Sequence, residues 1–209
     1  MATTSSLPRV EMRRTAVTEA LLDHAVDVMT ESGVGALSIS EVARRGGMRG
    51  PSVYKYFPSL HAVYDALFAR GLRLMVEALD DALAREPAGI GRVRAGAVAV
   101  VRWCTENPAL AQLMFWRVVP GFAPSDDVFA ASVASMQRLR DELAAAVRLG
   151  ELDDDAVTDD ALRLFTVLLS GLISQQLANE PGVPFDRGAF TRLTESALDL
   201  FFTRYARRQ

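Results

Sequence analysis

The chain has 209 residues, half of them apolar, with a net charge of −3 and one cysteine. This length suits one large domain or a small domain followed by a larger one, and the apolar content can bury a sizeable core. No apolar run approaches about twenty residues, which argues against a transmembrane span. The single cysteine excludes an internal disulfide and fits a protein of the reducing cytoplasm.

The N-terminal part begins with a polar stretch and continues into a helix. Residues 1–8 are small and polar without a hydrophobic segment, so we expect a disordered tail and not a secretory signal. Apolar residues then recur at helical spacing over residues 14–32, and Gly33 is a natural end for that helix.

The next segment, residues 38–57, predicts two short helices joined by a tight turn. Ser38 and Glu41 form a capping box, in which each side chain can satisfy a free backbone N–H at the start of a helix. Gly46-Gly47 allows the left-handed conformation that ends a helix, and Pro51 suits the first turn of the next one.

This arrangement is typical of a helix-turn-helix, whose second helix enters the DNA major groove. Val53 and Phe57, four residues apart, would hold that helix on its domain. The positions expected at the DNA are Ser38, Ser40, Arg49, Gly50, Pro51, Ser52, Tyr54, Lys55 and Tyr56.

The same segment resembles the DNA-binding domain of the TetR family of transcriptional regulators, and the resemblance extends from about residue 9 to 68. The matching positions are Ser38, Val42, Ala43, Gly47, Met48, Pro51, Ser52, Val53, Tyr54, Tyr56 and Phe57. Two positions depart from the family pattern: Arg49 replaces a hydroxyl cap, and Leu60 replaces a lysine that would touch phosphate.

Charge gives little support for DNA binding. Residues 1–58 carry seven basic and six acidic side chains, a net charge of +1, and residues 59–209 carry a net charge of −4. The expectation of DNA binding therefore depends on the motif and not on a basic surface.

The remaining sequence predicts further helices and no strands. A long helix over 59–85 would connect a DNA-binding domain (9–58) to a larger helical domain (59–209). Further helices are expected at about 92–106, 107–119, 125–149, 158–179 and 186–208, and the acidic run 151–155 is expected to be a loop and not a metal site. The predicted fold class is all-α, with an N-terminal three-helix domain and a C-terminal ligand-binding and dimerisation domain.

The last two predicted helices are apolar nearly all round, which indicates burial on two sides. One explanation is a central core helix beside an ordinary terminal helix. The other is a homodimer in which these helices from two chains form a four-helix bundle, the arrangement that the TetR resemblance implies. The expected dimerisation residues are Leu169, Leu172, Ile173, Leu198, Phe201 and Phe202.

Aromatic and sulfur-containing side chains gather in the middle of the chain. Such a cluster can be plain core, but the family resemblance implies a small-molecule pocket here, and its composition favours an apolar or aromatic effector. The expected ligand-binding residues are Trp103, Met114, Phe115, Trp116, Phe122, Phe165 and Leu168.

No catalytic pattern is evident. His24 and His61 do not belong to a metal-ligand cluster, and neither a phosphate-binding glycine loop nor a nucleophile motif is present, so we expect no enzyme activity, cofactor or metal. The sequence thus predicts a cytoplasmic homodimeric regulator, a repressor that binds a palindromic operator in double-stranded DNA and responds to a small effector. The alternative is a helical small-molecule-binding protein without DNA function, which the departures at Arg49 and Leu60 favour.

Overall fold

The structure is a computed structural model that describes residues 9–207; the predicted tail, residues 1–8, lies outside this range. Within residues 9–207 the regular secondary structure is helical, apart from one isolated β-bridge between Leu152 and Ala206. The α-helices are α1 (Arg9–Ser32), α2 (Ile39–Arg45), α3 (Gly50–Val53), α4 (Leu60–Leu83), α5 (Ile90–Glu106), α6 (Pro108–Phe115), α7 (Asp126–Arg148), α8 (Asp159–Asn179) and α9 (Thr194–Arg204). Short 3₁₀ turns are η1 (Val34–Ala36), η2 (Asp154–Val157), η3 (Phe185–Arg187) and η4 (Thr191–Leu193).

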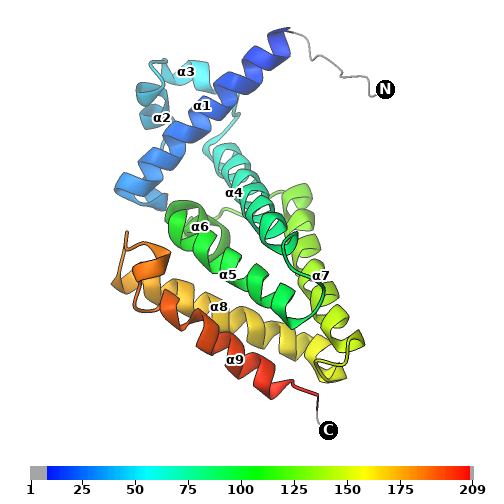
Figure 1. Cartoon of the computed structure of the whole chain (residues 1–209). Helices are drawn as coiled ribbons and strands as arrows, with labels where there is room; N and C mark the ends of the chain where they lie inside the picture. Colours follow the sequence, from blue (N-terminus) through cyan, green and yellow to red (C-terminus); the bar gives the residue numbers. More distant parts are fainter. Residues whose placement is uncertain (1–8, 208–209) are drawn as a thin grey trace.

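Helices α1 to α3 form one end of the molecule, which we call the head, and α4 leads from the head into the body (Figure 1). In the body α5 is central, because it packs against α4, α7, α8 and α9. Helices α8 and α9 lie side by side at the end farthest from the head (Figure 1). The all-α prediction is confirmed.

The connecting helix α4 begins where the sequence places it. The Ser59 side chain accepts a hydrogen bond from the Ala62 N–H at 3.1 Å and so caps the helix. Further along, α5 approaches α4 closely, because a β-carbon at Gly96 would meet Leu79 at 2.9 Å. This close packing ties the long helix to the centre of the body.

The last helix is shorter than predicted, because the expected start at residue 186 falls in the 3₁₀ turns η3 and η4. There the buried Gln176 side chain accepts hydrogen bonds from the backbone N–H groups of Phe190 and Thr191, at 3.2 and 3.3 Å. Glu180 accepts another from the Ala189 N–H at 2.6 Å. These tertiary bonds compete with the helix, so α9 begins only at Thr194.

Helix α8 is long and apolar enough to cross a membrane by length and composition alone, which the sequence analysis did not anticipate. In this fold it packs against α5 and α9. Its inner side buries Phe165, Leu169 and Ile173, as expected of a core helix.

Candidate DNA interface and effector chamber

The corner between α2 and α3 has the geometry that its glycines predict. Ser38 caps α2 by accepting from the Glu41 N–H at 3.3 Å. Gly47 adopts φ +62°, a conformation that costs a β-carbon-bearing residue energy, and the Met48 N–H then bonds the Ala43 carbonyl at 2.8 Å. Met48 is partly buried and packs against the core.

Helix α3 is held by apolar side chains and presents polar ones. Val53 and Phe57 are buried, whereas Tyr54 is 54% exposed and Lys55 is exposed. Arg49 occupies the N-cap position with an extended backbone and makes no side-chain cap bond, so the helix begins without the hydroxyl that the family pattern has there. Regular helix ends at Val53, earlier than predicted, and residues 54–56 form a turn.

Arg14 supports the end of this recognition segment from α1, a role that the sequence alone did not reveal. Its guanidinium donates to the Lys55 carbonyl at 3.2 Å and lies 6.0 Å from the centre of the Tyr56 ring. The expected DNA-contacting positions therefore come together around the α2–α3 corner in the head, at the end of the molecule opposite α9 (Figure 1).

Part of the basic charge in the head is already neutralised. Glu41 accepts from Arg44 at 2.7 and 2.9 Å and from Arg45 at 3.0 Å, and Arg45 also forms two bonds with Glu31. The hydrogen bonds from Arg44 and Arg45 lower the pKa of Glu41 to about 2. Arg49 and Lys55, which make no ion pair within residues 9–207, are left as the better candidates for phosphate contact.

Leu60, the second departure from the family pattern, is half-buried and packs against the core in the first turn of α4. It offers no charge to a phosphate. Its apolar packing instead holds the first turn of α4 against the core.

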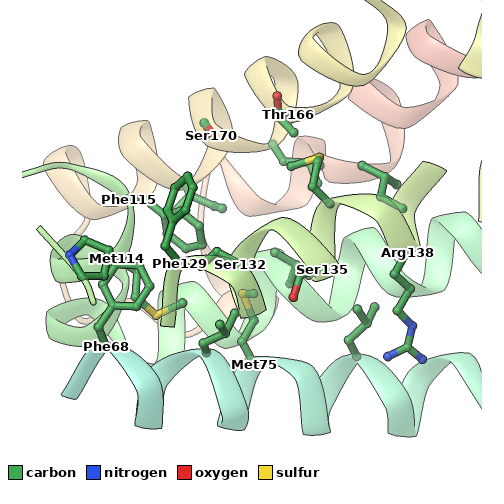
Figure 2. A pocket seen from close by; sticks show the side chains of 18 of the residues that line it. Phe68, Met75, Met114, Phe115, Phe129, Ser132, Ser135, Arg138, Thr166 and Ser170 are labelled. Atoms are coloured by element: carbon green, nitrogen blue, oxygen red, sulfur yellow. The ribbon is translucent and has the colours of Figure 1, made fainter. Parts of the chain in front are cut away.

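A cavity of about 710 Å³ lies in the body among α4, α5, α6, α7 and α8, and we call it the chamber (Figure 2). Five of the seven predicted ligand-binding residues line it: Met114, Phe115, Trp116, Phe122 and Phe165. Trp103 does not, because it is buried in the core beyond the part of α5 (93–100) that lines the chamber. Leu168 is directed to another side of α8.

Sequence reasoning missed the contributions of α4 and α7 to the chamber. Figure 2 shows Phe68 and Met75 projecting from α4, and Phe129, Ser132 and Arg138 projecting from α7. The spacing of apolar residues in α4 is consistent with either a core face or a chamber wall. Only the position of α7 relative to α4 makes the space between them a cavity.

The loop between α6 and α7 (residues 116–125) connects the chamber to the head. Phe122 lines the chamber, and its ring centre lies 5.6 Å from that of Tyr64 and 6.0 Å from that of His61. The buried Tyr64 hydroxyl donates to the carbonyl of Val34 in η1 at 2.7 Å. Two successive contacts, Phe122 with Tyr64 and Tyr64 with Val34, thus connect the chamber to the turn between α1 and α2.

A second attachment of the same loop lies one residue further along α4. The Asp65 carboxylate accepts hydrogen bonds from the Ser125 N–H at 2.7 Å and from its hydroxyl at 2.9 Å. Ser125 occupies the N-cap position of α7, but its side chain makes no cap bond there and instead binds α4.

Five of the six predicted dimerisation residues are buried within one chain. Leu169, Ile173, Leu198, Phe201 and Phe202 lie in the core of one chain, where Phe165, Phe201 and Tyr205 also pack ring against ring, and Leu172 is half-buried. A side chain packed within one chain is unavailable to a second one. Other apolar residues of these helices are exposed, Val167 at 64% and Leu200 at 69%.

Cys104 is buried, and desolvation raises the pKa of its thiol to about 12, so it stays protonated at neutral pH. Within residues 9–207 no group of three or more His, Cys, Asp or Glu side chains is placed to hold a metal ion.

Comparison with known proteins assigns the head and the body to the same family of regulators. Residues 21–67 match the family described as "Bacterial regulatory proteins, tetR family", and residues 93–198 match "Tetracyclin repressor-like, C-terminal domain". The HTH-type transcriptional regulator Rv1816 of Mycobacterium tuberculosis is 29% identical over 145 residues, which cover 67% of this chain and 56% of that protein. The HTH-type regulator YobS of Bacillus subtilis is 26% identical over 98 residues, 47% of this chain and 51% of that protein. The matches thus span little more than half the length of these relatives.

Solved structures agree over nearly the whole chain. The crystal structure of the regulatory protein SCO4313 has a TM-score of 0.74 at 26% identity, covering 93% of this chain and 98% of that one. A Rhodococcus sp. RHA1 protein of unknown function has a TM-score of 0.72 at 26% identity, covering 91% and 95%. The helix-turn-helix head, the helical body and these matches together show that the chain belongs to the TetR family of non-enzymatic, DNA-binding transcriptional regulators.

Proposed function

We propose that the protein is a cytoplasmic homodimeric repressor that binds a palindromic operator and is released by a small, mostly apolar effector. The observation that carries this proposal is the chain of contacts from the chamber through Phe122 and Tyr64 to Val34 in the head. It gives an occupant of the chamber a physical means of affecting the orientation of the head.

The mechanism is differential binding of two conformations. A dimeric helix-turn-helix protein reads two half-sites about 34 Å apart, one DNA turn, so small changes in the spacing of its heads alter its affinity for the operator. An effector that binds better to a conformation with another spacing shifts the population away from DNA. The loop at residues 116–125 supports this mechanism, because it lines the chamber and contacts α4 near its start.

Selection from a random pool of double-stranded DNA at fixed salt tests the DNA-binding part. We expect enrichment of a palindromic site, because a two-fold dimer reads the same sequence on both strands. If a folded protein enriches no sequence, the assignment of a sequence-specific repressor is wrong, and the alternative of a binding protein without DNA function is favoured.

Variants of α3 test which residues read the selected site. Tyr54→Ala and Lys55→Ala should each weaken binding about tenfold or more, the effect of losing one well-made contact. Lys55→Ala should also reduce the salt dependence of binding by about one counterion. Arg148→Ala, at an exposed site in the last turn of α7, is the control and should bind normally. Unchanged affinity in both α3 variants would contradict this recognition surface.

A further inference from the structure

The chamber is long and narrow. Along α4 its wall runs in a single stripe from Phe68 to Leu83, about 22 Å at 1.5 Å per residue, and along α7 it runs from Phe129 to Glu142, about 20 Å. A volume of about 710 Å³ distributed along walls of that length indicates an elongated space. Such a space favours an extended molecule over a bulky, rounded one.

One end of the chamber is aromatic and open. Phe68, Phe115, Trp116 and Phe129 line this end, and Phe115 and Phe129 are 47% and 59% exposed, although large aromatic side chains are normally covered (Figure 2). Rings placed in this way favour edge-to-face or offset contact with another aromatic ring. This end therefore suits the ring of a ligand.

Hydroxyl groups lie beside these rings. Ser132 is one turn from Phe129 on α7, and Ser170 faces the chamber from α8 near Phe115 (Figure 2). A serine hydroxyl both donates and accepts hydrogen bonds. A hydroxyl group on the ligand ring would thus find a partner at the aromatic end.

The opposite end is aliphatic. Leu79 and Leu83 of α4, Val93 of α5 and Leu139 of α7 line it, next to Arg138 and Glu142 of α7. Branched aliphatic walls contact a flexible hydrocarbon chain without needing a particular orientation. This end suits an alkyl chain.

The charged residues deeper in the chamber already have partners. Arg138 pairs with Asp80 of α4, and Glu142 accepts from Arg92 of α5 at 2.9 Å. Arg92 also donates to the Leu83 carbonyl at 2.8 Å, which fixes its position. A charged group placed at this depth would meet side chains whose charges are already paired, and that is unfavourable. Arg117 and Asp126 also line the chamber, but both are exposed, so water screens their charges.

From these features we infer that the effector is an uncharged, elongated molecule of the alkylphenol type, with a hydroxyl-bearing aromatic ring between Phe115 and Phe129 and an aliphatic chain directed toward Leu83. A phenol has a pKa near 10 and is neutral at pH 7. This inference rests on the proposed function of the chamber as an effector site.

Binding of four defined probes, followed by tryptophan fluorescence because Trp116 lines the chamber, tests the inference. The probes are 4-heptylphenol, phenol, decanoate and decylammonium. We expect 4-heptylphenol to bind at least tenfold more tightly than each of the others, and Trp116→Phe to remove most of the signal. If phenol binds as tightly as 4-heptylphenol, the alkyl chain of the ligand contributes nothing and its proposed role is wrong. If either charged probe binds as tightly as 4-heptylphenol, the requirement for an uncharged ligand is wrong. Absence of 4-heptylphenol binding would overturn the ligand class.

A cavity-filling variant tests the orientation. Ala97 lines the aliphatic half from α5, so Ala97→Leu should weaken 4-heptylphenol at least fivefold and leave phenol unchanged. Ala95→Leu, on another side of the same helix, is the matched control. If Ala97→Leu weakens the binding of both ligands equally, or of neither, the proposed orientation of the alkyl chain toward Leu83 is wrong. Leu139→Phe fills the same end from α7 and replaces Ala97→Leu if that variant does not fold.

The ligand class and the proposed function fail in different experiments. DNA selection with the ligand-free protein reports on the head whatever the chamber binds. If 4-heptylphenol binds as expected but no DNA is selected, the repressor assignment is wrong and the ligand class stands. If DNA is selected but 4-heptylphenol does not bind, the ligand class is wrong and the repressor assignment stands.

Discussion

Glu41 shows how single residues organise the head. The same carboxylate that the capping box predicts at the start of α2 holds the guanidinium groups of Arg44 and Arg45, and Arg45 reaches back to Glu31 of α1. One acidic side chain therefore connects the start and end of α2 and, through Arg45, joins this helix to α1. Arg44 and Glu31 are exposed, whereas Glu41 and Arg45 are half-buried, so water screens part of the attraction in this network.

The lowered pKa of Glu41 makes a prediction for pH dependence. Its pKa is about 2 in the folded protein against an ordinary 4.5, so its contribution to stability is complete above about pH 4.5 and is lost as the pH falls toward 2. Glu41→Gln should be less stable than the wild type at pH 7, and the difference should shrink between pH 4.5 and 2. Urea unfolding across this range measures it, with Asp27→Asn, at an exposed site of α1, as the control. A difference independent of pH would contradict this role of Glu41.

At the scale of elements, α4 joins the chamber to the head. Its first turns meet the loop of residues 116–125 through His61, Tyr64 and Asp65, and its later turns form one wall of the chamber. Met114 of α6 approaches α4 at Gly71, where a β-carbon would lie 2.6 Å from the methionine sulfur. In the proposed mechanism, an occupant of the chamber would therefore contact a helix that is closely packed against α5 and α6.

Tyr64→Phe tests the bond that fastens α4 to η1. Removal of the hydroxyl leaves the Val34 carbonyl without this partner in a buried site, so we expect a loss of about 1–2 kcal/mol in the free energy of unfolding. Tyr54→Phe, which removes a hydroxyl from an exposed ring, should leave stability unchanged. Denaturant unfolding of both variants measures the difference, and equal stability of the two would show that the bond contributes nothing.

For the whole molecule, burial divides α8 and α9 into an inner and an outer side. Leu198 and Phe201 pack inside the chain, so a charge at Phe201 would test folding and not association. Val167 and Leu200 are exposed on these two neighbouring helices, and Gly171 has open space around it. These features suit the proposed helix bundle between two chains.

Val167→Glu and Leu200→Glu should convert the proposed dimer into a folded monomer, because each places a charge in an apolar interface. Sedimentation at micromolar protein concentration measures the mass, and operator binding should fall with it. Val133→Glu makes the same change at an exposed site on α7 and should remain dimeric. Dimers in all three variants would place the interface elsewhere.

The sequence by itself determined the all-helical fold class, the helix-turn-helix with its Ser38 cap and glycine corner, and most of the helix boundaries. These features depend on local backbone preferences, capping and the spacing of apolar residues, which are written along the chain. The tertiary structure decided which apolar residues of α8 and α9 face inward, because a helix that is apolar all round does not indicate its own core side. It also decided that α4 and α7 enclose the chamber and that Gln176 delays the start of α9 to Thr194. Each of these depends on contacts between residues far apart in sequence, and no local pattern encodes such contacts.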